Sequence, residues 1–419
     1  MRMITILIHF IKLIENYSHL NMSMEPLASM KKIALTVHLW TGLVFGTILV
    51  VLGLTGSALS WMHELDVFLN PDLLHVAPPR ALRTGDPLRV DPALIQAVGD
   101  ALAGDPRYGK PNTLETPVRA GDVFVASYRS APGHGNAPWV QSVTRQVMID
   151  PANLSVTGER NWGELGISRL LLMPTLFHIH RYMVAGETGK VIVAVTGVSL
   201  LLTVLTGMIL WWPRMIRLAI WNAVTVRHGG SWPRFSFQLH RAGGFFAAPV
   251  LLVSALSGIH FNMPQWVAPV VNVISPVTPN TKLMNRSIRP SDGMSVAVAV
   301  TAAQAKFPDG RVSRVSFPAK TGQPFEIRVR QSAEFRQGPG ATRISIDSGD
   351  ASVLRVIDPE RAQGGDKFLS WLFPLHTGEA FGVVGRIFIS LFGLIPLAFF
   401  VTGLVIWVKL RKKKVGFGK

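Results

Sequence analysis

Residues 38–56 read HLWTGLVFGTILVVLGLTG, and residues 240–258 read HRAGGFFAAPVLLVSALSG. Each stretch opens on a histidine, has a glycine four residues later and another glycine eighteen residues later, and carries no charge beyond its second residue. An apolar segment of about 20 residues is long enough to cross the hydrocarbon core of a bilayer. The two stretches therefore predict two membrane-spanning helices, each with a histidine near its start.

A second histidine pattern lies between these stretches and is also repeated. His180 stands nine residues before Gly189, which stands eighteen residues before Gly207. His376, Gly385 and Gly403 repeat these intervals. Uncharged segments follow both histidines, so the chain is expected to cross the membrane four times. The predicted spans are residues 31–63, 191–212, 242–263 and 387–408.

The charged residues predict how these spans are oriented. The connector 213–241 and the tail 409–419 are rich in Lys and Arg and contain no acid, which is typical of cytoplasmic segments. Both termini are then cytoplasmic, and the loops 64–190 and 264–386 lie outside. Those two loops hold 23 of the 25 acidic residues, so basic residues dominate the cytoplasmic segments. The formal net charge of +17 is therefore explained by membrane topology, with attraction to lipid headgroups as a further effect, and does not indicate a nucleic-acid partner. The N-terminal segment 1–30 lacks a small-residue cleavage site, so no removed signal peptide is predicted, and Met24 or Met30 could be the start.

Both outer loops predict a helix followed by short strands. Alternating apolar and polar residues, separated by Pro- and Gly-rich turns, are typical of half-buried strands. In the first loop the expected helix is 92–102, and the expected strands are 123–130 and 139–149. In the second loop the expected helix is 295–307, and the expected strands are 311–317, 325–330 and 343–346. Ile149-Asp150 and Ile346-Asp347 are each followed by Ser-Val at the same spacing. The fold class is therefore an α-helical membrane protein with four transmembrane helices in two parallel repeats, each with an inserted extracytoplasmic α+β domain.

Two absences limit the chemistry. The chain has no cysteine, which excludes iron–sulfur clusters, thiolate-ligated or covalently attached haem, and disulfides. The sequence also lacks a dinucleotide fingerprint, a phosphate loop and a His-Glu-x-x-His zinc motif. Electrons would consequently reach any redox centre from a separate donor or from membrane quinol.

The repeated histidines are candidates for axial ligands of haem b. Two histidines at one membrane depth can hold a haem between helices, and small residues such as Gly42 and Gly244 leave room for a flat macrocycle. Topology places His38 and His240 at the cytoplasmic edge and His180 and His376 at the outer edge, so two haems are expected. The competing interpretation is close helix packing through small residues, with each histidine as a polar anchor.

Several further residues are weaker candidates. His63, His178 and His260 could assist or replace a ligand, although His178 points away from His180 on a helix and His260 points away from His240. Arg181 and Arg241 adjoin the histidines and could pair with haem propionates. Basic residues also gather at membrane edges without such a role.

The chain resembles the PepSY-associated transmembrane family. The resemblance rests on His38-Leu-Trp-Thr-Gly42, the Ile149-Asp150 turn, His178-Ile-His180-Arg181 and Gly186-Glu-Thr-Gly189, with equivalents in the second half, and extends over about residues 31–414. It implies PepSY-type modules outside a bacterial inner membrane and, as in some members, a haem-containing oxidoreductase that reduces ferric siderophores or chelates and releases Fe(II). The donor would be quinol or a cytoplasmic reductase. The second half departs from the pattern, with Leu375-His376-Thr377 in place of the His-x-His pair.

A non-enzymatic function is the alternative. PepSY-type modules could bind a ligand or regulate a partner, and the helices could form an anchor or a small-solute permease. The membrane histidines would then act as a proton relay or as packing anchors. The presence or absence of haem in the purified protein separates the two interpretations.

Overall fold

The computed structural model describes residues 25–78, 83–85, 87–129, 137–213, 216–227, 229–279, 281, 283–286, 294–335 and 338–416. Most of the predicted N-terminal segment 1–30, with Met24 as a possible start, lies outside this range. Four helices in the described residues are long and apolar enough to cross a membrane: Ser29–Leu59, Gly186–Trp211, Trp232–Asn262 and Glu379–Lys409. The prediction of four membrane spans is confirmed.

The spanning helices differ from the predicted spans at their ends. They are α2 (Glu25–Leu59), α7 (Gly186–Trp211), α9 (Trp232–Asn262) and, for the fourth span, α13 (Gly382–Phe392) with α14 (Ile395–Gly416). Because α9 begins at Trp232, His240 lies well inside the helix, whereas the sequence placed it just before the span. The connector also contains a short helix, α8 (Arg217–Val224).

The fourth span is not one continuous helix. Pro396 lacks the backbone N–H that would bond to the carbonyl of Phe392, and α13 ends at that residue. The interruption brings Gly393 against α2, where a Cβ on Gly53 would lie 2.4 Å from the carbonyl oxygen of Gly393. Ser57 Oγ of α2 also donates to the carbonyl of Ser390 at 2.7 Å. The side chain thus satisfies a carbonyl in the last turn of α13.

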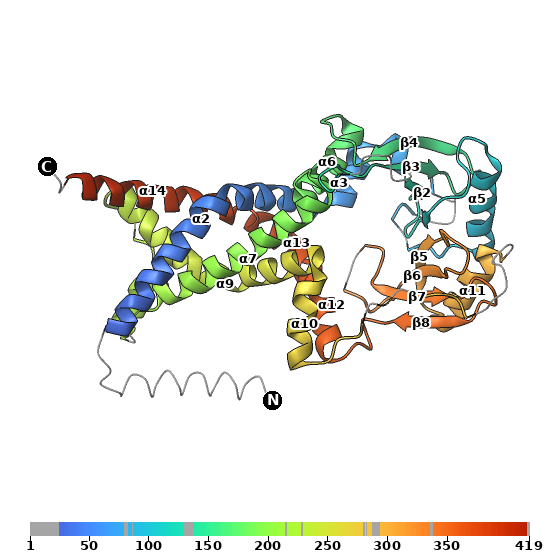
Figure 1. The fold of residues 1–419 in the computed structure, drawn as a ribbon. Helices are drawn as coiled ribbons and strands as arrows, with labels where there is room; N and C mark the ends of the chain where they lie inside the picture. The colour runs from blue at the N-terminus through green and yellow to red at the C-terminus, as the bar shows by residue number, and fades with distance from the viewer. Residues whose placement is uncertain are drawn as a thin grey trace. The chain divides into compact units, whose positions relative to one another are not determined.

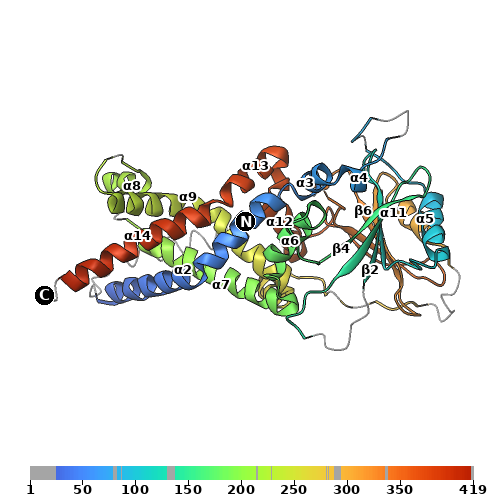
Figure 2. The same cartoon turned by 90° about the horizontal axis from the view of Figure 1, so that it is seen from above.

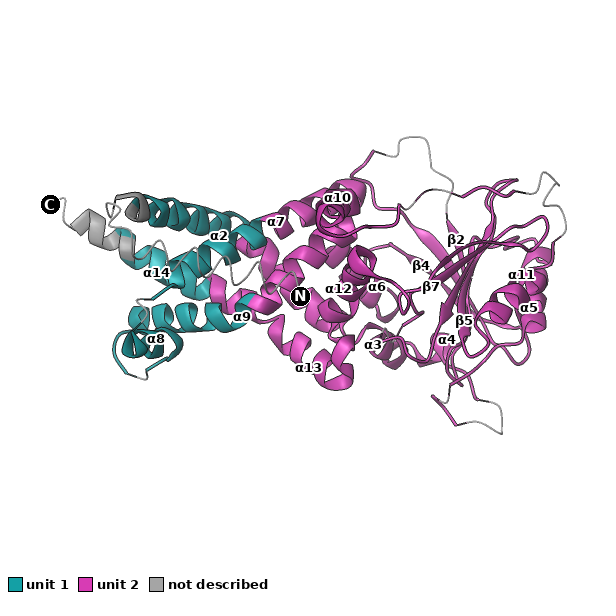
Figure 3. Cartoon of the chain, turned by 90° about the horizontal axis from the view of Figure 1, so that it is seen from below, with its two compact units in different colours: residues 1–45, 199–248, 401–419 teal, residues 46–198, 249–400 magenta. Residues whose placement is uncertain are grey.

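The chain forms two compact units (Figure 3). The first unit consists of residues 1–45, 199–248 and 401–419, and the second of residues 46–198 and 249–400. Helices α2, α7, α9 and α14 each contribute residues to both units. The part of the first unit that the structure describes is mainly helical, and the second combines helical segments with a β-sheet.

The two outer loops build one eight-stranded antiparallel sheet in the order β4-β3-β2-β1-β5-β6-β7-β8. Its strands are β1 (Thr113–Glu115), β2 (Phe124–Arg129), β3 (Thr144–Ile149), β4 (Val156–Trp162), β5 (Arg311–Ser316), β6 (Phe325–Arg330), β7 (Thr342–Ile346) and β8 (Val353–Ile357). The loops meet where Leu114 of β1 pairs with Val315 of β5. The expectation of two separate α+β domains is corrected in this respect: each loop supplies four strands, but the sheet is shared.

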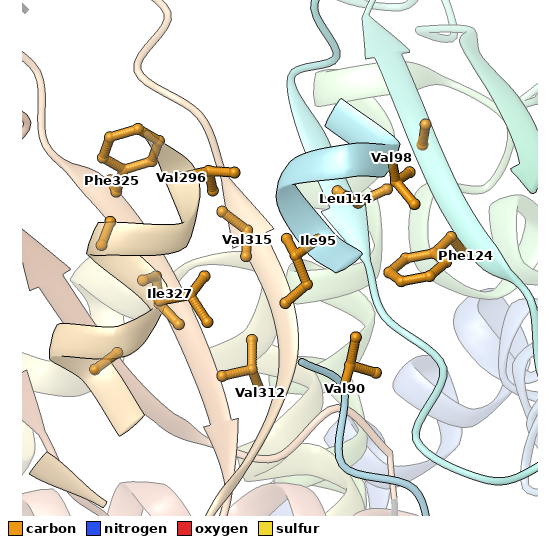
Figure 4. Close-up of a cluster of buried hydrophobic side chains, with 14 of the residues drawn as sticks. Val90, Ile95, Val98, Leu114, Phe124, Val296, Val312, Val315, Phe325 and Ile327 are labelled. Atoms are coloured by element: carbon orange, nitrogen blue, oxygen red, sulfur yellow. The ribbon is translucent and has the colours of Figure 1, made fainter. Parts of the chain in front are cut away.

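One hydrophobic core serves both halves of the sheet. Helices α5 (Pro92–Gly104) and α11 (Val296–Lys306) lie on the same face (Figures 1 and 2). Asp91 and Ser295 cap their N-termini by accepting hydrogen bonds from the backbone two residues on. The core residues drawn in Figure 4 come from both helices and from the central strands, and include Ile95, Val98, Leu114, Phe124, Val296, Val315 and Ile327.

The predicted shared turn is present in both halves. Asp150 N donates to the carbonyl of Ser155 at 2.9 Å, and Asp347 N donates to that of Ser352 at 2.8 Å. Leu154 and Ala351 occupy the same left-handed position, each with φ of 61°. The shared Ile-Asp and Ser-Val residues thus flank turns that close the β3–β4 and β7–β8 hairpins in the same way.

Short helices connect the sheet to the spanning helices of the second unit. They are α3 (Met62–Leu69), α4 (Pro71–Leu74), α6 (Arg169–Tyr182), α10 (Pro264–Ile274), α12 (Gly364–Thr377) and the single-turn η1 (Glu379–Phe381). Leu73 of α4 packs on Val123 and Met148, and Arg160 of β4 forms a buried ion pair with Asp66 of α3 at 2.8 Å. These contacts fix α3 and α4 to the sheet face opposite α5.

Candidate cofactor-binding histidine pairs

The histidine predicted at the start of the first span pairs with its counterpart in the third. Within the first unit, the ring centres of His38 on α2 and His240 on α9 are 6.0 Å apart, with the rings at 82° to each other. Two imidazoles on opposite sides of one metal ion have ring centres about 6 Å apart, because each metal–nitrogen bond is about 2.0–2.1 Å long and each ring centre lies about 1 Å behind its nitrogen. The spacing of the inner pair therefore suits axial ligation.

The other repeated histidines form a second pair of the same kind. Within the second unit, His180 near the end of α6 and His376 near the end of α12 have ring centres 6.2 Å apart, with the rings at 63°. The ring of Phe261 stands edge-on to His376 at 5.5 Å. The structure thus brings together the two pairs that topology had predicted.

Hydrogen bonds orient His38 and His180. The Nδ1 atom of His38 lies 2.9 Å from the carbonyl oxygen of Thr203, and that of His180 lies 2.9 Å from the carbonyl oxygen of Leu52. A carbonyl can only accept, so Nδ1 donates its proton and Nε2 keeps its lone pair. Such a bond to a backbone carbonyl is the usual way in which a metal-binding histidine is oriented.

A hydroxyl group contacts Nδ1 of each of the other two histidines. His376 Nδ1 lies 2.7 Å from Ser257 Oγ, whose own hydroxyl donates to the carbonyl of Val253 at 2.6 Å. Since that proton is already engaged, the serine oxygen accepts from the imidazole. His240 Nδ1 lies 2.9 Å from Thr402 Oγ1. The Nε2 side of His376 is thereby left for a ligand.

Each histidine is supported by a Thr-Gly or Ser-Gly dipeptide on another helix. These are Thr206-Gly207 for His38, Thr402-Gly403 for His240, Thr55-Gly56 for His180 and Ser257-Gly258 for His376. At two of the four, the glycine also makes room for the ring, because a Cβ would lie 3.1 Å from His38 and 2.9 Å from His180. A Cβ on Gly403 would make only an ordinary contact with His240, at 3.7 Å. The repeated intervals included these glycines, but no role toward the histidines was predicted for the hydroxyl residues that precede them.

The glycines of α2 and α9 divide into two groups. A Cβ on Gly42 or on Gly244 would meet nothing within 4 Å, so open space adjoins the helix one turn after each inner histidine. By contrast, a Cβ on Gly46 would lie 2.4 Å from the ring of Phe400. Gly46 and Gly53 therefore serve helix packing, as the competing interpretation expected, whereas Gly42 and Gly244 border space into which a flat ligand could fit.

The weaker histidine candidates lie in other surroundings. His178 is buried, contacts the carbonyl of Pro174 through Nδ1 at 2.8 Å, and stacks on Tyr182 with ring centres 5.4 Å apart. His63 is exposed and lies 3.9 Å from Asp122. His260 stands beside Phe261, and its buried Nδ1 has no hydrogen-bond partner among the described residues. None of these rings forms a facing pair like the other four.

Arg181 and Arg241, the predicted partners of the haem propionates, each follow a paired histidine in the sequence and donate a hydrogen bond to a backbone carbonyl. Arg181 Nη2 donates to the carbonyl of Phe261 at 3.2 Å, and Arg241 Nη2 donates to that of Asn222. The buried Nε of Arg241 has no partner in the part of the chain that the structure describes. Arg241 could therefore donate one more hydrogen bond to an anionic group.

The protein alone does not complete a metal site at either pair. In the described residues, no group of three or more His, Asp or Glu side chains could hold a metal ion. A metal held by two histidines must take its other ligands from a non-protein group, which is the situation of iron in haem. The residues present fit a bis-histidine haem at both pairs.

Comparison with known proteins identifies the family. No curated protein matches the chain. The profile of the PepSY-associated TM region matches residues 35–409, which include all four paired histidines and the whole sheet. The protein is thus a multi-pass membrane protein that belongs to the PepSY-associated TM family.

Proposed function

We propose that the protein is a dihaem b oxidoreductase of a bacterial inner membrane that passes electrons to a ferric siderophore or ferric chelate outside the cytoplasm. The observation that carries this proposal is the paired spacing of 6.0 and 6.2 Å, at sites where hydrogen bonds hold the imidazole rings through Nδ1. His38 and His240 would hold one haem, and His180 and His376 the other.

The division of roles follows from the residues. The paired histidines would hold haem b, which would supply one-electron transfer when bound. The protein residues hold the rings through Nδ1 and leave space at Gly42 and Gly244. Fe(II) carries less charge than Fe(III) and is bound less tightly by hard oxygen ligands, so reduction favours release of the iron.

The proposed topology places both termini in the cytoplasm and the sheet in the periplasm, in accordance with the basic connector and tail. The two halves would be parallel repeats, each consisting of a helix, part of the sheet and a second helix. The matched hairpin turns and the four Thr-Gly or Ser-Gly supports favour this duplication. Electrons would come from membrane quinol or from a separate cytoplasmic reductase.

Absorption spectroscopy of the purified protein tests the proposal. After expression with adequate haem supply, the protein should show a Soret band that shifts on reduction with dithionite. His38→Ala or His240→Ala should remove one haem and spare the other. A colourless wild-type protein would contradict haem binding and favour a binding, regulatory or permease function.

A second experiment tests the acceptor. The protein is reduced without oxygen, mixed with ferric chelates and monitored by the return of the oxidised spectrum. Reoxidation at a rate that depends on the chelate is expected. If no ferric chelate reoxidises the protein, it is an electron carrier with another acceptor.

A further inference from the structure

The sheet has a second face, on which arginines gather in the half built by β5 to β8. In β6, Phe325, Ile327 and Val329 point into the core beneath α5 and α11. Because side chains alternate along a strand, Arg328 and Arg330 point to the opposite face. We call this surface the arginine face and define it by Arg311, Arg314, Arg328, Arg330, Arg343 and Arg355.

The strand register sets arginine directly against arginine. Arg311 pairs with Arg330, and Arg314 pairs with Arg328, which also pairs with Arg343 on the next strand. Directly opposite residues have Cβ atoms about 4.5–5.5 Å apart, and like charges there are destabilising. The fold therefore maintains an arrangement that stability alone would not favour.

A β-bulge contributes to this arrangement. The register of β5 shifts between Val312 and Arg314, so Val312 and Val315 both remain in the core although they are three residues apart. The same shift puts Arg311 and Arg314 together on the arginine face. Bulges commonly re-aim a side chain at a functional site.

Acidic residues lie beside only part of this face, where Glu334 and Glu379 favour the charged form of Arg330. Glu115 forms an ion pair with Arg314, and Glu326 on the same face accepts a hydrogen bond from Ser345. Among the described residues, no ion pair involves Arg311 or Arg343, and the buried Nε atoms of Arg314 and Arg355 have no hydrogen-bond partner. Burial, together with the charges of Arg311 and Arg119, lowers the pKa of Arg330. The face therefore has capacity for an added anion.

The arginine face lies next to the element that carries His376. Phe335, in the loop after β6, packs on Trp371 of α12 with ring centres 4.9 Å apart. Arg330 interacts electrostatically with Glu379, which follows His376 by three residues. A ligand held by this face would be close to the outer histidine pair.

We propose that the arginine face binds the acceptor, and that this acceptor is a negatively charged ferric chelate whose metal is held by carboxylate or catecholate oxygens. Guanidinium groups bind such oxygens through paired, charge-assisted hydrogen bonds. An incoming anion also relieves the repulsion between the facing arginines. This inference rests on the proposed function, because it names the class of substrate that the outer haem would reduce.

Binding of a redox-inert analogue tests the proposal separately from electron transfer. The full-length protein in detergent is titrated by calorimetry with the gallium(III) tris-catecholate anion and with an uncharged gallium(III) trihydroxamate. We expect tighter binding of the anion, weakening as salt is raised. Arg311→Gln combined with Arg343→Gln should weaken anion binding by about tenfold or more and leave any binding of the uncharged chelate unchanged.

The control replaces two exposed lysines outside the arginine face, Lys306→Gln at the end of α11 with Lys320→Gln, and removes the same net charge. It should bind the anion as wild type does. The Arg311/Arg343 variant should keep its melting temperature, because neither arginine forms an ion pair among the described residues and the substitutions reduce repulsion.

Equal binding by both double variants, or no preference for the anionic chelate, would overturn the proposal. So would loss of binding to anionic-lipid vesicles in the Arg311/Arg343 variant alone, without loss of chelate binding. Gallium(III) accepts no electron here, so a protein that reduces no iron could still bind the analogue.

Discussion

The two histidine pairs have the same spacing but are built on different elements. His38 and His240 lie within the long spanning helices α2 and α9, whereas His180 and His376 lie on the short helices α6 and α12. Both short helices contain a proline and end just after the histidine, at residues in the left-handed region. The inner pair is therefore fixed by membrane helices, and the outer pair by elements that also connect to the sheet.

The immediate surroundings differ as well. The inner pair is followed on each helix by a glycine with open space beside it, Gly42 and Gly244. At the outer pair, the ring of His180 packs directly on Gly56, and Phe261 stands beside His376. The inner pair therefore has open space one turn after each histidine, whereas close contact between Gly56 and His180 fills the α2 side of the outer pair. Substitutions at the ligands and glycines of the two pairs test this difference.

The largest effect is expected from removing an outer ligand. His180→Ala or His376→Ala should remove the outer haem, so that the haem content measured by pyridine haemochrome falls by about half. The inner haem should remain reducible by dithionite, because its ligands lie in the other unit. His178→Ala is the matched control, since that ring packs among aromatic residues and should leave haem content unchanged. Unaltered haem content in His180→Ala would contradict the outer pair.

Two glycine substitutions should act in different ways. Gly56→Ala would place a Cβ 2.9 Å from the ring of His180, so it should lower the free energy of unfolding by about 1–3 kcal/mol, as overpacking commonly does. Gly42→Ala meets open space and should leave the haem-free protein as stable as wild type. Thermal unfolding of the haem-free proteins measures both effects.

With haem supplied, the prediction for Gly42→Ala changes. The added methyl group would then occupy space proposed for the macrocycle, and the inner haem should bind more weakly than in wild type. Normal haem binding by Gly42→Ala would show that the open space at this glycine is not part of the site. The pair of substitutions thus separates a packing glycine from one that borders a ligand.

The sequence predicted the local features well and the non-local ones poorly. Spans and the Asp150 and Asp347 turns follow from patterns within a few residues, so they were predicted correctly. The joining of the outer loops was not predicted, because β1 has only three residues and its partner β5 is far along the chain. A short strand carries almost no alternation signal, and its pairing depends on packing across the whole sheet.

The site shows the same division. The repeated intervals predicted which histidines would pair, because membrane depth is readable from topology. They did not identify Thr203, Leu52 or Ser257 as partners of Nδ1, since these groups come from other helices and two of them are backbone carbonyls. Any residue type can supply a backbone carbonyl, so the amino-acid sequence does not indicate which carbonyl will accept a hydrogen bond from a histidine.

Removing a hydroxyl should distinguish the two outer ligands. Ser257→Ala deletes the hydroxyl that accepts from His376, whereas Thr55→Val leaves His180 bonded to the carbonyl of Leu52. Ser257→Ala should weaken outer-haem binding by about 10-fold or somewhat more, the usual loss for a partner of a metal-binding histidine, and Thr55→Val by much less. Haem transfer to apomyoglobin measures both. Equal losses would show that the Leu52 carbonyl does not support His180.

The smallest effect concerns the ion pair between α3 and α13. Arg386 donates to Glu64 at 2.7 Å through both terminal nitrogens and to the carbonyl of Ser60, and its guanidinium lies over Trp61 at 4.1 Å. Burial opposes ionisation of Glu64, but the hydrogen bonds and charge of Arg386 outweigh it, and the pKa of Glu64 lies below its ordinary value of 4.5. The pair therefore stabilises the fold above pH 4.5 and loses this contribution as the pH falls through the lowered pKa.

Arg386→Gln, compared with Glu64→Gln, tests this contribution. Because Glu64 is partly exposed, each variant should lose only about 0.5–1 kcal/mol of stability near neutral pH. The difference from wild type should shrink on acidification below pH 4.5, where protonation of Glu64 breaks the pair in the wild-type protein as well. Denaturant unfolding of the detergent-solubilised protein between pH 3 and pH 7 measures the trend. A difference in stability that stays constant over that range would assign the role of Arg386 to its contacts with Ser60 and Trp61. The packing of α13 at the end of α2 would then not depend on the Glu64 carboxylate.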